Sequence, residues 1–163
     1  MTRLLVTLGV VGVLGCGADE QPQQPLPFSH AIHAGAEAIA CTDCHAGAET
    51  EAGAGLPALG TCMRCHMRPR GQQPNPREQT LRTLAAQGGP FRWVQVTRNE
   101  GHVYFSHRAH VAFAKMTCEG CHGDVRTWAA SPTQPNADLL SMSACMDCHR
   151  ERGASNECLT CHR

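Results

Sequence analysis

Cysteine and histidine recur in this sequence at a spacing that can hold a cofactor covalently. The motif Cys-x-x-Cys-His occurs five times in the 163 residues. Two thiols at this spacing can each form a thioether with one vinyl group on a porphyrin edge, and the histidine that follows can bind the iron. The pattern predicts five covalently attached c-type haems, held by Cys41, Cys44, Cys62, Cys65, Cys118, Cys121, Cys145, Cys148, Cys158 and Cys161, with proximal ligands His45, His66, His122, His149 and His162.

Two other uses of paired cysteines compete with haem attachment. The first two pairs are 17 residues apart, which lies inside the window for a four-cysteine zinc ribbon. However, five pairs cannot be grouped two by two, the later gaps of 23 and 9 residues fit a ribbon poorly, and zinc does not explain the histidines. Structural disulfides would suit an exported chain, but they also leave the histidines unexplained. Haem attachment is the preferred interpretation.

The histidines outside the motifs match in number the iron ligands that are still needed. Four of them belong to an internal repeat, because residues 28–45 and 105–122 share a Phe-Ser-His-x-x-His start and a Cys-x-x-Cys-His end. A repeat with its reactive residues in register indicates that the same kind of group is bound twice. The fifth, His102, has no counterpart, since Pro25 takes the matching position. We predict as distal ligands His30, His33, His102, His107 and His110.

The spacing within each repeated histidine pair has a geometric consequence. In a helix, residues three apart lie on one face with their Cβ atoms about 5–6 Å apart. Axial ligands approach an iron from opposite faces of the porphyrin, so two such neighbours must serve different irons. Each pair therefore draws two haems together, which favours electron hopping between them.

The composition favours a fold built around cofactors. Aromatic residues make up 4% of the chain, which also contains 16 glycines and 10 prolines, so side chains alone would form a thin core. We expect mainly short α-helices and loops wrapped around haems, with little regular secondary structure. A helix is expected around residues 77–87, and residues 91–97 alternate weakly like a strand. The formal net charge of zero gives no reason to expect nucleic acid as a partner.

The motifs divide the chain into segments. We expect a flexible tether at residues 17–27, a dihaem segment at 28–70, a linker at 71–100 and a trihaem segment at 101–163. Residues 28–163 can also pack as one pentahaem domain.

The N-terminus predicts export. Residues 1–16 contain one arginine, Arg3, followed by an apolar run that is too short to span a bilayer. Their end, Val-Leu-Gly-Cys, resembles a bacterial lipoprotein cleavage site, which would make Cys16 the lipidated residue. The alternative is an ordinary signal peptide with a stray cysteine. The expected location is the periplasm or the cell surface, with the protein anchored to a membrane through lipid.

The repeated segments resemble a known family. FSHAIH followed by CTDCH, and FSHRAH followed by CEGCH, are similar to the opening of the class III multihaem cytochromes c, the low-potential trihaem and tetrahaem group. The resemblance implies that His30 pairs with His45 and His107 with His122, while His33 and His110 reach other haems of their clusters. The second half also resembles the pentahaem cytochrome c subunit of alternative complex III. The first cluster departs from the family pattern, because it has two motifs rather than three.

These residues together indicate electron transfer rather than catalysis. Iron closed by two imidazoles has no open position for substrate, and without a methionine ligand its potential is expected to be low. We expect electrons to pass between a membrane quinol-oxidising or respiratory complex and a periplasmic or extracellular acceptor, with redox proteins as partners and no small organic substrate.

One class of enzyme is the main alternative. A small multihaem reductase would need one haem with an open or lysine-filled distal position. Lys115 is the only lysine of the chain, and His102 is the distal ligand that rests on the count alone. A subunit in which the haems serve mainly as scaffold is a further alternative.

Overall fold

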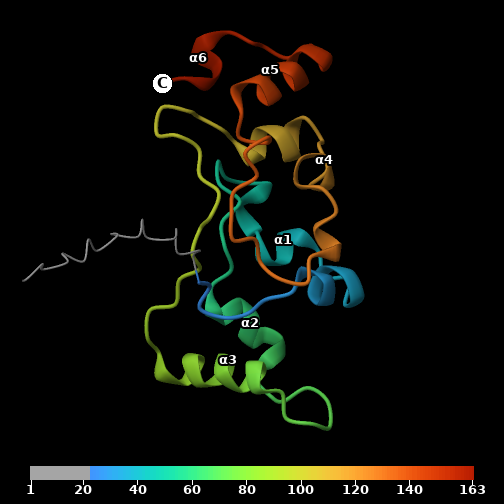
Figure 1. Ribbon diagram of the computed structural model, residues 1–163, viewed down its shortest axis with the longest axis vertical. Helices are drawn as coiled ribbons and strands as arrows, with labels where there is room; N and C mark the ends of the chain where they lie inside the picture. The colour runs from blue at the N-terminus through green and yellow to red at the C-terminus, as the bar shows by residue number, and fades with distance from the viewer. Residues whose placement is uncertain (1–22) are drawn as a thin grey trace, which may run out of the picture.

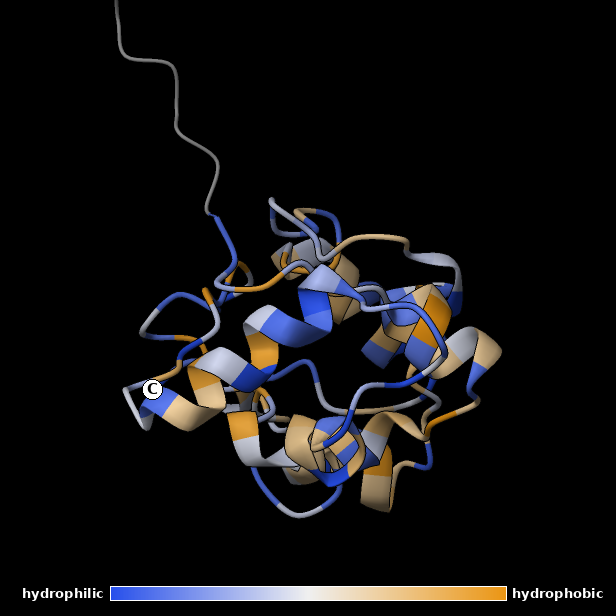
Figure 2. Cartoon of the chain, turned by 90° about the horizontal axis from the view of Figure 1, so that it is seen from below, coloured by the Kyte–Doolittle hydropathy of each residue, from blue (hydrophilic) through white to orange (hydrophobic). Residues whose placement is uncertain are grey.

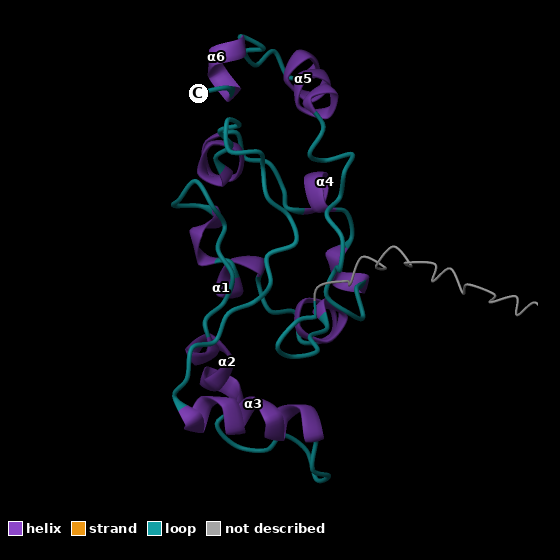
Figure 3. Ribbon diagram, turned by 60° about the vertical axis from the view of Figure 1, so that its left-hand side comes forward, coloured by secondary structure: helices purple, strands orange, loops and turns teal. Residues whose placement is uncertain are grey.

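The computed structural model describes residues 23–163 as short helices joined by long loops (Figure 3). In this part of the chain the only β-pairing is an isolated antiparallel bridge between Val103 and His162. The expected fold of short helices and loops is confirmed. The predicted signal peptide, lipidated Cys16 and the start of the tether lie outside the described residues.

Each Cys-x-x-Cys-His motif occupies its own helix (Figure 1). The two cysteines of a motif are three residues apart, so one helical turn places both thiols on the same face. The histidine follows as the last residue of the helix, inside it, or as its C-cap, and so emerges beside that face. The motif helices are α1 (Cys41–Cys44), α2 (Leu59–His66), α4 (Glu119–His122), α5 (Met142–Glu151) and α6 (Cys158–Cys161).

The repeated histidine pairs also lie on helical turns. The turn η1 (Ala31–Ala36) starts immediately after His30 and contains His33, and η3 (Ala109–Phe113) contains His110. Both turns are π-helical, a form that is rare and often found at functional sites. Short 3₁₀ turns, η2 (Ala46–Ala48) and η4 (Val125–Thr127), follow α1 and α4. The two repeats therefore share their local structure as well as their sequence.

The longest helix, α3 (Pro76–Gln87), confirms the helix expected at residues 77–87. The Asn75 side chain caps its start by accepting a hydrogen bond of 3.0 Å from the Arg77 amide, and Pro76 suits the first turn. Gly88 ends the helix in the left-handed region, with φ 62°. Because α3 packs against α2, the expected linker is part of the structure that surrounds the second motif.

The weak strand expected at residues 91–97 is wrong. This segment forms no ladder with other described residues. Its polar groups are partnered individually instead: Trp93 donates its indole N–H to the Pro57 carbonyl, and Val94 exchanges two hydrogen bonds with the Gln24 side chain. Gln24 and the buried Leu26 thus attach the last part of the expected tether to the fold.

Side chains contribute very little buried core. Among the described residues only three apolar side chains are buried, those of Leu26, Ala48 and Leu81. Hydrophobic residues are spread over the helices rather than gathered into one layer (Figure 2). A chain of this size normally needs a substantial core or covalent and metal staples to be stable, so this arrangement requires further apolar material in its interior.

The molecule is elongated, with α2 and α3 at one end and α5 and α6 at the other (Figure 1). The first and second repeats meet in the middle. The Ala31 amide donates to the Trp128 carbonyl at 2.9 Å, and the His107 amide donates to the Ala52 carbonyl at 2.8 Å. Within residues 23–163, no helix has both the length and the apolarity needed to cross a bilayer.

Candidate haem-binding sites

Four histidine pairs bring a motif histidine opposite one of the other histidines. In each pair the two residues come from different elements, and the rings face one another at similar distances. Ring centroids are 6.1 Å apart for His33 and His66, 6.4 Å for His107 and His122, 6.0 Å for His110 and His149, and 5.5 Å for His102 and His162.

The remaining two histidines are also neighbours. The pKa of His30 is lowered by burial and, to a lesser extent, by the nearby rings of His45 and His33. His30 Nδ1 is buried and has no hydrogen-bond partner among the described residues. Eight of the ten histidines therefore fall into four pairs with measured ring separations, and His30 lies close enough to His45 to be influenced by its charge.

The separation within the pairs fits an iron between the rings. An imidazole nitrogen binds a transition metal at about 2 Å, so two nitrogens on opposite sides of one metal are about 4 Å apart. Each centroid lies roughly 1 Å behind its nitrogen, which puts the centroids at about 6 Å. The residues present thus fit a bis-histidine metal centre at the four measured pairs.

Hydrogen bonds orient the rings in the way metal ligands require. Metal-binding histidines usually give the N–H of their second nitrogen to a carbonyl or carboxylate, which leaves the first nitrogen free for the metal. Five histidines here place Nδ1 against a backbone carbonyl, which leaves Nε2 free. The contacts are His33 to Ser29 at 2.9 Å, His45 to Gly55 at 2.7 Å, His107 to Ala52 at 3.2 Å, His110 to Ser106 at 2.8 Å and His149 to Ser155 at 2.7 Å.

A carboxylate takes the place of the carbonyl at the second motif. Glu78 on α3 places Oε1 3.4 Å from Nδ1 of His66, an electrostatic contact that is not aligned as a hydrogen bond. The Arg70 amide donates to Oε2, and this bond is the largest influence that lowers the pKa of Glu78. The carboxylate is thus held ionised beside the ring, where it makes the imidazole a more basic ligand.

The phenylalanine of each repeat supports the histidine pair that follows it. The ring of Phe28 stacks on His33 at 4.5 Å and meets His30 edge-on at 4.9 Å. Phe105 repeats both contacts, at 4.4 Å with His110 and 4.9 Å with His107. Such aromatic contacts hold the rings in fixed orientations.

His102 reaches its partner through backbone pairing. The Val103–His162 bridge, the bond from the Tyr104 amide to the Cys161 carbonyl and the bond from the Arg163 amide to the His102 carbonyl lay the two segments side by side. Lys115, the alternative distal group, is exposed. The structure therefore places His102, and not a lysine, opposite His162.

Seven of the ten motif cysteines are half-buried, and the other three, Cys65, Cys145 and Cys158, are exposed. Burial is the main cause that raises the pKa of Cys44, Cys62, Cys118, Cys121 and Cys145. All ten cysteines of residues 23–163 are free, and no group of three or more Cys, His, Asp or Glu side chains in this part of the chain is arranged to hold a metal ion. These residues thus contain neither the ligand cluster that a zinc site would need nor the bonded cysteine pairs of the disulfide alternative.

Apolar side chains line space next to one motif histidine. A cavity of about 300 Å³ opens beside His122, and its walls include Trp128, Pro132 and Leu139. Burial, followed by the rings of His107 and His45, lowers the pKa of His122. Polar side chains, among them Gln134 and Asn136, complete the walls of this cavity.

Several supporting residues had no role in the sequence argument. The carbonyls of Ser29 and Ser106, the rings of Phe28 and Phe105 and the carboxylate of Glu78 all contact candidate ligands. The two serines and the two phenylalanines belong to the repeated Phe-Ser-His sequence, which could have indicated their role. Nothing in the sequence pointed to Glu78, because the fold of α3 onto α2 brings it to His66.

Comparison with known proteins identifies the second half of the chain. Residues 103–163 match the family model described as cytochrome c7 and related cytochrome c. This segment belongs to the cytochrome c7-type multihaem cytochromes c. The matched residues contain three of the five motifs together with His107 and His110, whereas His102 lies one residue before them. The match of this segment agrees with the class predicted from the motifs, a multihaem c-type cytochrome that takes part in electron transport.

The similarity to one curated multihaem cytochrome extends along most of the chain. The menaquinone reductase multiheme cytochrome c subunit of Nitratidesulfovibrio vulgaris (strain Hildenborough) is 27% identical over 165 residues, which cover 88% of this chain and 78% of that protein. The family membership of residues 103–163 is thus accompanied by a relative that also aligns with the first half.

Proposed function

We propose that this cytochrome is an electron-transfer subunit that holds five haems, each closed by two histidines. The observation that carries the proposal is the pairing of the histidine rings at 5.5–6.4 Å, a separation that suits one iron between two imidazoles. The carbonyls on Nδ1 support it, because they leave Nε2 free to bind.

The pairing supports a specific set of ligands. The proposed proximal and distal partners are His45 with His30, His66 with His33, His122 with His107, His149 with His110, and His162 with His102. The two histidines of each repeat thus serve different haems, as the three-residue spacing requires. Attachment would use the two cysteines of each motif.

The haem irons supply the capacity to accept and release single electrons at potentials that bis-imidazole ligation keeps low. The chain holds the histidines in position. Backbone carbonyls fix the ring orientations at five of them, and Glu78 makes an electrostatic contact with His66. With both axial positions filled from the protein, little rearrangement accompanies a change of oxidation state, and no position is left for a substrate.

The relative suggests the partner. Because the similar protein is named as a subunit of a menaquinone reductase, we propose that this chain passes electrons within a membrane-associated complex that handles menaquinone. The expectation from the sequence was transfer between a membrane quinol-oxidising or respiratory complex and a periplasmic or extracellular acceptor, whereas the relative's name favours delivery toward a quinone. The proposed partners are redox proteins on both sides of the subunit.

The proposed location is the periplasm or the cell surface, because c-type haem is attached outside the cytoplasm. Lipidation at Cys16 would hold the subunit next to its membrane partners. The proposed organisation is a dihaem half and a trihaem half, which meet through the contacts between residues 31 and 128 and between 52 and 107.

Haem counting and carbon monoxide test the proposal. The chain is expressed in a host that attaches c-type haem, and haem per protein is measured together with the reduced absorption spectrum before and after addition of carbon monoxide. We expect five haems and no spectral response. Fewer haems would contradict the count, and a response equal to one haem would reveal an open site and favour the reductase alternative.

A further inference from the structure

The two repeats contact each other through equivalent residues. Cys41 and Cys118, which occupy the same place in the repeats, are close enough to influence one another electrostatically. His45 and His122, also equivalent, are close enough to influence one another electrostatically. When two copies of a segment touch through the same residues, the copies are related by an approximate two-fold axis, as in an isologous dimer interface.

The backbone contacts show the same reciprocity. The segment that follows the first motif accepts hydrogen bonds from the start of the second repeat, at His107 and Arg108. The segment that follows the third motif accepts a hydrogen bond from the start of the first repeat, where the Ala31 amide donates to the Trp128 carbonyl. Each repeat thus donates backbone hydrogen bonds to the other half and accepts them from it. A head-to-tail arrangement would produce only one of these two contacts.

The remaining motifs lie outward from this centre. Cys44 is close enough to Cys62 and Cys65 of the second motif to interact with them electrostatically. Its equivalent, Cys121, is beside Cys148 and Cys145 of the fourth motif. The second and fourth motifs therefore occupy matching positions on opposite sides of the axis.

The fifth motif extends one side only. Cys145 neighbours Cys161, and the bridge to His162 anchors α6 next to residues 102–104. On the opposite side, α3 covers the second motif. Figure 1 shows the same succession along the long axis, from α3 and α2 through α1 and α4 to α5 and α6.

We propose that the five haem sites form one unbranched path in the order 62–66, 41–45, 118–122, 145–149 and 158–162, with the two repeats packed head to head at its centre. The inference rests on the proposed function and adds the order of the sites. In this path the site of residues 62–66 comes before that of residues 41–45, which reverses their order in the sequence. An electron that enters at one end leaves at the other after passing every site. The ends are the site of His66 and the site of His162.

The path assigns a role to each distal pair. In the first repeat, His30 serves the inner site of His45 and His33 the outer site of His66. In the second repeat, His107 serves the inner site of His122 and His110 serves the outer site of His149. Each three-residue spacing therefore joins an inner site to an outer one, and the contact between the repeats joins the two inner sites.

Distances between labelled residues test the order. Two double variants carry gadolinium chelate tags on introduced cysteines, Glu51→Cys with Arg108→Cys and Arg70→Cys with Arg108→Cys. Cys16→Ser excludes labelling at that position and removes the proposed lipid anchor, and haem attachment consumes the other ten cysteines. The tag-to-tag distance is measured by double electron–electron resonance with the haems reduced, so that low-spin iron has no unpaired spin. Haem content and spectrum are recorded on the same samples.

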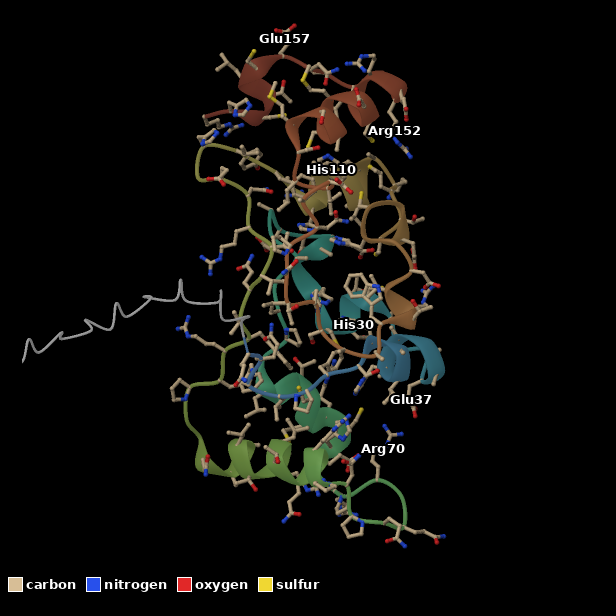
Figure 4. All side chains as sticks on the ribbon, in the orientation of Figure 1. His30, Glu37, Arg70, His110, Arg152 and Glu157 are labelled. Carbon is tan, nitrogen blue, oxygen red and sulfur yellow. The ribbon has the colours of Figure 1, made fainter. Side chains whose placement is uncertain are left out.

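The two orders make opposite predictions. The Arg108 amide lies 3.0 Å from the Glu51 carbonyl, whereas Arg70 lies at the end of the molecule away from His110 (Figure 4). We expect a short distance for the 51/108 pair and a distribution shifted to clearly longer values for the 70/108 pair. A sequential, head-to-tail order would reverse this ranking and overturn the proposal. A matched pair with Glu37→Cys and Arg70→Cys should be short in either case, because these side chains form an ion pair at 3.5 Å.

Failure of the underlying function gives a different result. Samples with fewer than five haems, or with a response to carbon monoxide, would contradict the proposed ligation. Five closed haems combined with the reversed ranking would contradict only the order.

Discussion

The imidazole of His102 lies parallel to that of His162, with centroids 5.5 Å apart and an angle of 16° between the planes. This pair joins the residue with the weakest support in the sequence to the last motif of the chain. Backbone pairing of residues 102–104 with residues 161–163 produces the contact. The proposed fifth site therefore depends on a strand-like contact, whereas the proposed distal ligands of the other four come from the two repeats.

Replacement of His102 should open one haem. In His102→Ala we expect carbon monoxide to bind one of the five haems and to change its share of the reduced spectrum, because the ring opposite His162 is lost. His102→Met is the matched control and should stay closed while the potential of that haem rises, since thioether ligation favours the reduced iron. An unchanged spectrum in His102→Ala would assign the sixth ligand of this haem elsewhere.

Loss of the carboxylate beside His66 should raise one reduction potential. In Glu78→Gln the imidazole becomes a weaker donor, which stabilises the oxidised iron less. We expect one of the five potentials to rise by on the order of 60 mV, which is about a tenfold change in a one-electron equilibrium. Glu37→Gln is the control, because Glu37 pairs with Arg70 rather than with a histidine. Equal shifts in both variants would point to general surface charge, and spectroelectrochemical titration would measure them.

The cap of α3 should matter for stability but not for haem content. Asn75→Ala removes the acceptor of the Arg77 amide, a loss of about 1 kcal/mol in the free energy of unfolding. Asn75→Ser keeps a capping oxygen and should retain most of that energy. Denaturant titration of the haem-loaded protein measures both variants. A loss of haem in Asn75→Ala would show instead that α3 is required for attachment at the second motif.

Removal of haem should abolish the compact fold. Only three apolar side chains are buried in the described residues, and a domain with so small a core depends on its staples. The chain produced without haem attachment is expected to have an increased hydrodynamic radius and little helical circular dichroism. A compact haem-free chain with native helical content would show that the polypeptide core suffices.

Replacement of Trp128 should loosen the junction between the repeats. Its ring meets His30 edge-on at 6.0 Å, and its carbonyl accepts the Ala31 amide. Trp128→Ala removes the ring contact and leaves the carbonyl, so we expect faster hydrogen exchange in residues 28–36 and 123–128 with five haems retained. Trp128→Phe keeps an aromatic ring and should restore most of the protection. Equal exchange in wild type and Trp128→Ala would show that the carbonyl alone holds the junction.

Local patterns predicted the local structure well. The spacing of Asn75, Pro76 and Gly88 is typical of a capped helix, and α3 has those ends. The weak alternation at residues 91–97 failed, because Trp93 and Val94 find side-chain and single carbonyl partners rather than a neighbouring strand. Strand formation needs a second segment in register, and seven alternating residues do not provide it.

The sequence by itself determined the cofactor class, the number of motifs and the supply of ten histidines, because covalent attachment and ligand chemistry depend on residue type and short spacing. The tertiary structure alone decided which histidine faces which. It brought Glu78 to His66 and His102 to His162, and it placed the first and third motifs together. Such relations join residues tens of positions apart, and only the folded backbone defines the distances between them.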